Sequence, residues 1–190
     1  MKNTILIYPF NEGDDYWTDP LKLQKQINFL EKEPSFSLCF HNSNVLNLKE
    51  GTQTLFRTSS RKIYKTRDVI LNKWFCPTAS VVYNNTILKK GIYLKRDKKI
   101  VNQDQLLLFS ASLHGSLYFM DEVMSTYRYG VAGSASEKYN SMYKKYKNMF
   151  NYLTYLNKIS KSEFIIYIYI KRLYITLSII KNIVFKKQHK

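Results

Sequence analysis

The pattern of apolar and polar positions divides the first forty residues into a strand, a helix and a second strand. Residues 5–10 form a short apolar run that predicts a buried strand. A helix is predicted over residues 21–30, where apolar side chains recur at helical spacing, at Leu23, Ile27 and Leu30. Residues 33–35 break this pattern, and the apolar residues 36–40 then predict a second strand that ends at His41-Asn42.

The turn between the first strand and the helix is rich in acidic residues. Asp19 is a suitable N-cap, and Pro20 then takes the first helical position, where its missing N–H costs nothing. Gly13 lets the backbone bend and lets a ligand approach closely. A divalent cation bound through carboxylates and substrate phosphates fits the crowded acids of this turn, which are Glu12, Asp14 and Asp15. An exposed turn without a ligand is the alternative, because Asp and Gly favour turns for local reasons.

The middle of the chain alternates basic loops with short elements. Residues 47–68 carry cations that could meet phosphates, although a solvated surface is the commoner case: Arg57, Arg61, Lys62, Lys65 and Arg67. A second basic loop covers residues 88–99. The apolar pattern predicts a short helix or turn at 69–71, a strand at 80–83, a helix from 102 to 109, and strands at 115–120 and 122–128.

Two helical segments are expected at the C-terminal end. Residues 139–159 place apolar side chains at spacings of three and four. Residues 164–185 contain a helical seam, although their first half has the composition of a strand; the seam consists of Ile166, Ile170, Leu173, Leu177, Ile180 and Val184. Lys171-Arg172 splits this apolar run, so it is not a standard transmembrane helix. Two interpretations stay open: a basic amphipathic helix on anionic lipid, and packing against the domain or a second copy.

Composition and charge narrow the classes of function. The 190 residues are 45% hydrophobic, enough for one domain with a real core. Thirty Lys and Arg against 14 Asp and Glu give a formal charge of +16, which favours an anionic partner. No helix-turn-helix, zinc-finger or RNA-binding signature supports nucleic acid as that partner. Cys39 and Cys76 lie in apolar contexts typical of buried free thiols in a reducing compartment. The first apolar run is too short for a signal peptide.

The stretch from Glu12 to Glu31 closely resembles the family 2 glycosyltransferases, which have the GT-A fold. The resemblance rests on Glu12-Gly13-Asp14-Asp15-Tyr16-Trp17-Thr18-Asp19-Pro20, Lys22-Leu23-Gln24-Lys25-Gln26 and Phe29-Leu30-Glu31. Weaker similarities at Cys39-Phe40-His41-Asn42, Pro77–Ser80 and Tyr127-Arg128 extend it over roughly residues 5–136. It implies an α/β fold, with a partial GT-A, Rossmann-like domain over residues 1–136. The spacing and charge of the remaining residues predict a helical, basic, amphipathic tail over residues 137–190.

The resemblance also implies roles for single residues. In the family, the acidic turn is a variant Asp-x-Asp motif that holds Mg²⁺ or Mn²⁺ and the donor diphosphate. This implies a metal site at Glu12, Asp14 and Asp15, and donor phosphate contacts from Asp14, Asp15 and Arg128. Asp104 takes the position of the general base, and Thr78 and Ser80 lie on the acceptor side. Each has a structural alternative: Asp104 as a helix N-terminal acid, Arg128 as a strand-end arginine, Thr78 and Ser80 as partners of loop backbone.

Several positions depart from the family pattern. Gln103 and Gln105 flank Asp104 where the family usually has an acid or glycine before the base and often tryptophan after it. Gly130 stands where the family's Tyr-Arg-x-His motif has its histidine, so this chain lacks any help from that side chain with metal or diphosphate. His41 is either a ligand or, as is commoner, a structural histidine bonded to the backbone.

The predicted function is metal-dependent, inverting transfer of a sugar from a nucleotide-diphosphate donor to a glycan or lipid-linked acceptor of a cell-surface polysaccharide or lipopolysaccharide. The expected cofactor is Mn²⁺ or Mg²⁺. The expected location is the cytoplasm, with peripheral contact at the inner face of the cell membrane left open and no nucleic-acid partner. The rival interpretation is a non-catalytic basic module that binds a membrane or nucleic acid.

The length before the acidic turn leads to one more expectation. Only eleven residues precede Glu12, whereas the family has a longer nucleotide-binding half there. We therefore expect an N-terminally truncated enzyme that is slow or inactive by itself, with a first strand that lacks neighbours.

Overall fold

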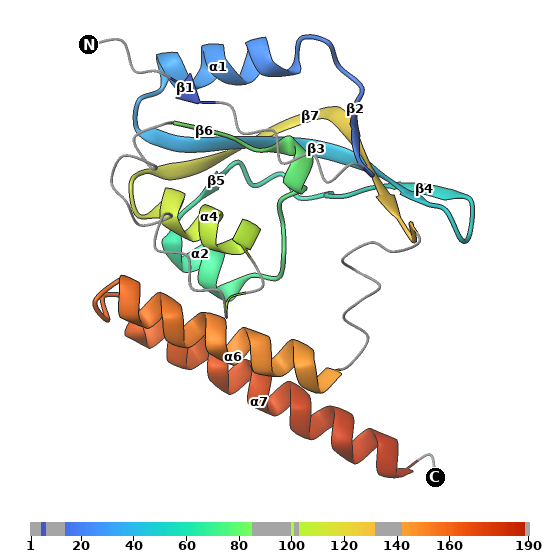
Figure 1. The fold of residues 1–190 in the computed structure, drawn as a ribbon, viewed down its shortest axis with the longest axis vertical. Helices are drawn as coiled ribbons and strands as arrows, with labels where there is room; N and C mark the ends of the chain where they lie inside the picture. The colour runs from blue at the N-terminus through green and yellow to red at the C-terminus, as the bar shows by residue number, and fades with distance from the viewer. Residues whose placement is uncertain (1–4, 7–13, 85–99, 101–102, 132–141, 189–190) are drawn as a thin grey trace.

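The structure is a computed structural model that describes residues 5–6, 14–84, 100, 103–131 and 142–188. Its described strands form a mixed sheet in the order β1-β6-β3-β7-β2, with β4 beside β3 and β5 beside β7 (Figure 1). The strands are β1 (Ile5–Leu6), β2 (Tyr16–Trp17), β3 (Phe36–Asn47), β4 (Thr52–Leu55), β5 (Ile63–Tyr64), β6 (Val82–Asn84) and β7 (Ser116–Tyr129). The central pair, β3 and β7, is parallel, and the other pairs are antiparallel.

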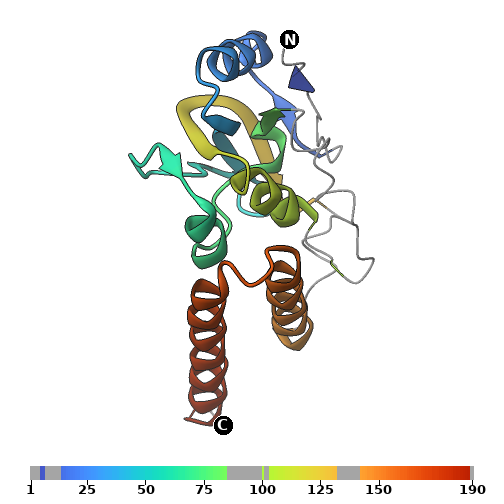
Figure 2. The ribbon, with the colours of Figure 1, turned by 90° about the vertical axis from the view of Figure 1, so that its left-hand side faces the viewer.

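Helices cover both faces of this sheet, which confirms the α/β class (Figures 1 and 2). Helix α1 (Lys22–Lys32) lies on one face, and α2 (Thr66–Leu71) and α4 (Gln103–Ser112) lie on the other. The 3₁₀ turn η1 (Thr78–Ser80) leads into β6. Helices α6 (Met142–Ile159) and α7 (Ile165–Gln188) form a hairpin on the far side of α2 and α4. The expected helices at 102–109 and 139–159 are confirmed, and the tail is a helix rather than a strand.

Several predicted boundaries are wrong. The first helix begins at Lys22 with Leu21 as its N-cap, while the Asp19 carboxylate accepts the Leu21 N–H at 2.7 Å. The second strand continues past His41-Asn42 to Asn47, although its register with β7 is irregular there. The strand material expected at 115–120 and 122–128 is confirmed, and it forms one continuous strand, β7. The 47–68 excursion contains β4, β5 and the start of α2.

The first strand pairs with β6, Ile5 opposite Asn84 and Leu6 opposite Tyr83. The expectation that this strand lacks neighbours is therefore wrong for Ile5 and Leu6. Residues 7–10 of the predicted strand lie outside the described residues, as does the basic loop at 88–99.

Side chains of β3 alternate between the two faces of the sheet. Leu38 and Phe40 pack with Leu107 and Leu108 of α4, and Cys39 packs with Leu30 of α1. Cys39 and Cys76 are buried free thiols, as predicted. Burial raises the pKa of the Cys39 thiol to about 12.

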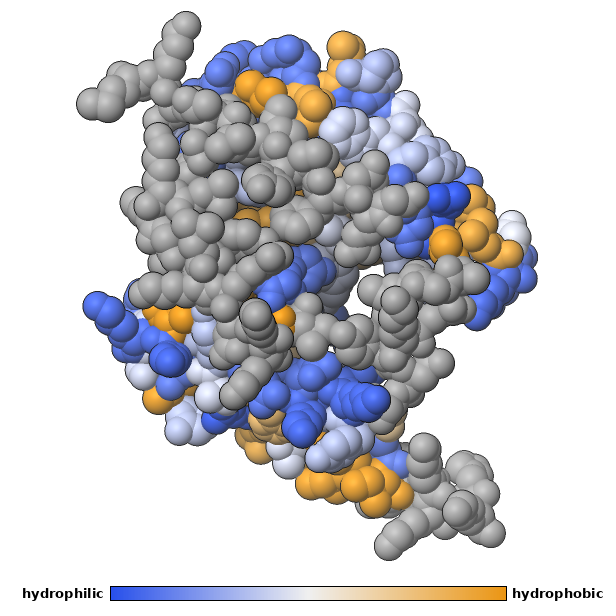
Figure 3. All heavy atoms as spheres, in the orientation of Figure 1, coloured by the Kyte–Doolittle hydropathy of each residue, from blue (hydrophilic) through white to orange (hydrophobic). Residues whose placement is uncertain are grey.

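Helix α7 rests on the domain with one face and leaves the opposite face open. Ile168 and Ile175 are buried against α2 and α4, whereas the predicted seam from Ile166 to Ile180 is exposed. Hydrophobic residues consequently remain on the surface over the hairpin (Figure 3). Within the described ranges, no helix combines the length and apolar character needed to cross a bilayer.

Candidate functional site

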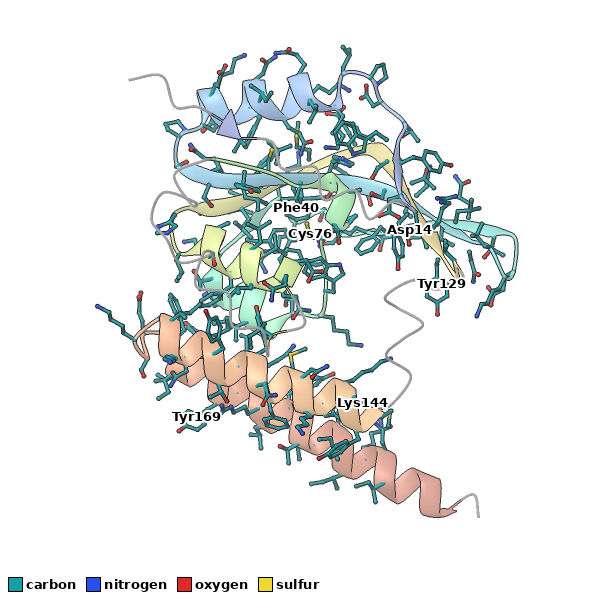
Figure 4. The ribbon with its side chains drawn as sticks, viewed as in Figure 1. Asp14, Phe40, Cys76, Tyr129, Lys144 and Tyr169 are labelled. Atoms are coloured by element: carbon teal, nitrogen blue, oxygen red, sulfur yellow. The ribbon has the colours of Figure 1, made fainter. Side chains whose placement is uncertain are left out.

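The described part of the acidic turn lies where β2 meets β7. Asp14 and Asp15 directly precede β2, whose two residues pair with Thr126 and Ser125 of β7. This pairing carries the two acids toward the end of β7, and Figure 4 shows Asp14 on the Tyr129 side of the sheet. Glu12, the third predicted metal ligand, lies outside the described residues.

Arg128 contacts both acidic residues. Its backbone N–H donates to Oδ1 of Asp15 at 3.2 Å, and its Nε donates to the backbone carbonyl of Asp14. The residue thereby fixes the turn against β7 and places a positive charge near the Asp15 carboxylate. The structure thus brings together the three residues predicted to bind the donor phosphates.

The surroundings of the two carboxylates suit a cation. Asp15 is 7% exposed, and burial raises the pKa of its carboxyl, with Asp14 adding to the rise and Arg128 opposing it. Oδ1 of Asp14 is shielded from solvent and accepts no hydrogen bond from a described residue. An unpaired carboxylate oxygen beside a second, buried carboxylate fits Mg²⁺ or Mn²⁺, which prefer oxygen ligands. The described residues contain no cluster of three or more His, Cys, Asp or Glu, so these two acids supply only part of a ligand set.

The turn η1 is tied to the acidic residues through Trp17. Nε1 of Trp17 donates to the carbonyl of Ala79 at 3.1 Å. Ser80 is fully buried and its hydroxyl donates to the Pro77 carbonyl at 2.6 Å, which is the loop-backbone arrangement that the sequence left open. Thr78 is half-buried, and its hydroxyl has no hydrogen bond to another described residue. Of the two acceptor candidates, Thr78 is therefore the one whose hydroxyl is unoccupied within the described chain.

Asp104 lies in the first turn of α4. Its Oδ1 accepts the N–H of Gln105 at 2.9 Å, as expected of an acid at a helix N-terminus. Burial raises the pKa of its carboxyl, a direction that suits a general base. Burial also raises the pKa of the Cys76 thiol and Asp104 adds to that rise, so Asp104 lies near the chain leading into η1. Within the described chain, no hydrogen bond connects Asp104 with Asp14 or Asp15.

Lys22 is a residue of this region that the sequence did not single out. It is 1% exposed, and its Nζ lies 4.3 Å from the centroid of the Trp17 ring. Burial lowers the pKa of its ammonium group to about 8. Lys22, Gln26 and Leu30 form the buried face of α1, at a regular spacing of four. The spacing of four is visible in the sequence, but two of the three residues are polar. The apolar residues Leu23, Ile27 and Leu30 therefore predicted a neighbouring face of the helix as the buried one.

His41 is fully buried on the face of β3 that meets α1. Its Nδ1 lies 2.6 Å from the Asn42 carbonyl, which requires the proton on Nδ1, and its Nε2 has no partner among the described residues. Burial lowers the pKa of the ring to about 3, so the imidazole is neutral. The geometry matches a structural histidine bonded to the backbone.

Comparison with known proteins gives relatives but no family, because no family model matches the chain. The proteins named Uncharacterized protein Rv1520 of Mycobacterium tuberculosis (strain ATCC 25618 / H37Rv) and Uncharacterized protein Mb1547 of Mycobacterium bovis are each 32% identical to it over 117 residues. The alignment covers 62% of this chain and 33% of each relative. The chain thus spans about a third of the length of the curated relatives it matches.

Proposed function

We propose that this chain is a glycosyltransferase domain of the family 2 type with a GT-A-like fold. It transfers a sugar, with inversion, from a nucleotide-diphosphate donor to a glycan or lipid-linked acceptor of the cell surface. The observation that carries the proposal is the meeting of Asp14, Asp15 and Arg128 at the end of β7. Carboxylates beside a guanidinium can bind a divalent cation and diphosphate oxygens together. A mixed sheet with helices on both faces is compatible with this Rossmann-like architecture.

In the proposed reaction, Asp104 accepts the proton of an acceptor hydroxyl. The hydroxyl oxygen bonds to the anomeric carbon as the bond from that carbon to the donor diphosphate breaks. Thr78 orients the acceptor, and Arg128 pairs with the phosphate oxygens. Glu12, Asp14 and Asp15 are the proposed ligands of Mg²⁺ or Mn²⁺, which when bound offsets the charge of the leaving diphosphate.

Calorimetry with Mn²⁺ and nucleoside diphosphates tests the donor site. The double variant Asp14→Asn with Asp15→Asn is expected to lose Mn²⁺-dependent binding of UDP or GDP by at least about tenfold, equivalent to about 1.4 kcal/mol. The matched control is Asp121→Asn, which removes an exposed carboxylate from the same strand, β7. Equal affinities for the double variant and the control would contradict the proposal.

A separate arm tests the base. A panel of nucleotide sugars is offered to the wild-type chain and to Asp104→Asn, and donor consumption is followed. The variant is expected to keep diphosphate binding while its turnover drops by about a hundredfold or more. Measurable wild-type turnover that Asp104→Asn leaves unchanged would exclude Asp104 as the base without affecting the donor site.

A non-catalytic membrane-binding module is the second candidate function, because α7 exposes an apolar face. Binding to vesicles by a chain that binds no nucleoside diphosphate would favour this candidate.

A further inference from the structure

Helix α7 is apolar on two opposite faces, and only one of them is covered. The inner face contributes Ile168 and Ile175, 2% and 6% exposed, to the core shared with α2 and α4. The outer face carries a stripe at spacings of three and four, whose members are 49–69% exposed: Ile166, Ile170, Leu173, Leu177 and Ile180. Tyr169 flanks the stripe and points away from the domain (Figure 4). A helix that is apolar on both sides normally has both sides buried.

The apolar surface continues into a groove between the two helices of the hairpin. The groove has a volume of about 480 Å³ and lies where the beginning of α6 meets the end of α7. Its walls are mainly apolar and aromatic: Met142, Tyr143, Tyr146, Phe150, Ile179 and Ile183. Nδ2 of Asn182 donates to the Tyr146 hydroxyl at 3.0 Å and holds the two helices together there. Figure 3 shows hydrophobic residues gathered at this end of the molecule.

The helical hairpin is strongly cationic. Residues 142–190 contain eleven Lys and Arg and one acidic residue, Glu163. Lys171 is buried against α2 and Arg172 donates to Thr154, so these two cations already have partners within the protein. Lys144, Lys145 and Lys147 are exposed at the beginning of α6, and Lys147 lines the groove.

We propose that the outer face of α7, together with this groove, docks the protein on an anionic lipid bilayer. An apolar stripe beside lysines is the arrangement by which an interfacial helix binds anionic lipid. Exposed tyrosines such as Tyr143 and Tyr169 suit the boundary between water and hydrocarbon. A second copy is a poorer occupant, because pairing through this face would bring two strongly cationic hairpin ends together. The surface goes beyond the proposed glycosyltransferase activity and is independent of it.

Sedimentation of the full chain with vesicles tests the proposal. The chain is expected to bind phosphatidylcholine vesicles that contain phosphatidylglycerol, to bind pure phosphatidylcholine weakly, and to dissociate as salt is raised. The triple variant Ile170→Ser, Leu173→Ser, Leu177→Ser is expected to bind at least about tenfold more weakly, because exposed apolar surface no longer enters the bilayer. Lys144→Gln, Lys145→Gln, Lys147→Gln is expected to reduce the preference for anionic vesicles.

The matched control removes three apolar residues of the β-sheet part that are 47–49% exposed, against 49–61% in the α7 triple variant, with Leu48→Ser, Leu55→Ser and Ile63→Ser. This control is expected to bind vesicles as the wild type does, as is Asp14→Asn with Asp15→Asn. Thermal unfolding verifies that each variant is folded. Wild-type protein that ignores anionic vesicles would overturn the proposal. So would a wild-type dimer in analytical ultracentrifugation that the α7 triple variant converts to a monomer.

Discussion

At the residue scale, the space between α1 and β3 holds polar groups where an apolar pattern would be expected. Gln26 donates to the carbonyl of Ser80 at 2.8 Å, and Lys22 contacts the Trp17 ring. Trp17 in turn bonds to Ala79, so these residues fix β2 and η1 to each other. Burying polar groups costs free energy unless they are paired. Here the pairing positions the strand that follows directly on Asp14 and Asp15.

Buried His41 makes the stability of the protein depend on acid. Its folded pKa of about 3 lies below the ordinary 6.5, so as pH falls below 6.5 the unfolded chain binds a proton that the folded chain does not. Stability is therefore lost between pH 6.5 and about 3, by about 1.4 kcal/mol per pH unit from this group.

Replacing His41 with a non-titrating residue is expected to remove that slope. Urea denaturation of wild type and His41→Gln over this pH range provides the measurement. On acidification, the wild type is expected to lose stability steadily relative to His41→Gln. The contributions of the other titrating groups are common to both proteins and cancel in the comparison. Parallel curves from pH 6.5 downward would show that the folded ring takes up its proton as readily as the unfolded one.

The candidate site was only partly predictable at this scale. The family resemblance placed Asp14, Asp15 and Arg128 in one group, and the pairing of β2 with β7 explains their proximity in the structure. The sequence could not show that the Ser80 hydroxyl is already hydrogen-bonded, because its partner is the backbone carbonyl of Pro77 in the same turn. Lys22 was missed since a lysine on a helix is normally solvated, and only packing shows the Trp17 ring above it.

At the element scale, β3 and β7 show why strand lengths were underestimated. The apolar run of β3 ends at Phe40, and a register irregularity follows between His41 and Ser43. Beyond it the strand continues because its polar residues find partners across the pair. Ser43 and Ser125 are both buried, with their hydroxyl oxygens 2.6 Å apart. A search for apolar runs therefore misses the part of a strand whose buried residues are polar and hydrogen-bond to one another.

A lysine attaches α7 to α2. Nζ of Lys171 donates to the carbonyls of Leu71 and Asn72, at 2.7 and 3.0 Å, at the C-terminus of α2. A cation at this end of a helix satisfies carbonyls that have no partner within the helix. Lys171, which interrupts the apolar run of the tail in the sequence, therefore joins α7 to α2 in the fold.

Lys171→Met retains the alkyl stem and removes this bridge. We expect a loss of roughly 1–3 kcal/mol in the free energy of unfolding, because two carbonyls at the end of α2 lose a charged donor. Lys158→Met, at an exposed position of α6, serves as the control and is expected to change stability by less than about 0.5 kcal/mol. Chemical denaturation of both variants measures the difference. Equal stabilities would show that Lys171 does not bind α2 in solution.

At the scale of the whole molecule, α4 joins the sheet to the helical hairpin. Leu107 and Leu108 belong to the core beneath β3, while Leu106 and Phe109 pack with α6 and α7. The sequence predicted this helix from its apolar run, but a run of four apolar residues does not say which elements lie on either side. A division into residues 1–136 and 137–190 also stays a prediction. The shared packing around α4 suggests instead that the two parts unfold together.

Leu156→Ala tests that expectation. Leu156 of α6 is fully buried in the cluster that contains Phe109 of α4 and Ile70 of α2. The truncation is expected to cost about 2–5 kcal/mol through lost burial and the cavity left behind. Trp74 lines a cavity shared with α6 and α7, so it is replaced by Phe in every protein compared. Tryptophan fluorescence then reports on the sheet part through Trp17, and far-UV circular dichroism is dominated by the helices.

If the molecule is one cooperative unit, both signals move to lower denaturant by the same amount in Leu156→Ala. Leu177→Ala, on the exposed face of α7, leaves both transitions within about 0.5 kcal/mol of the wild type, because its side chain is 56% exposed. A circular dichroism transition that shifts while the fluorescence transition stays in place would mean that the hairpin unfolds separately. In that case the packing around α4 would contribute little to the stability of the sheet that carries Asp14, Asp15 and Arg128.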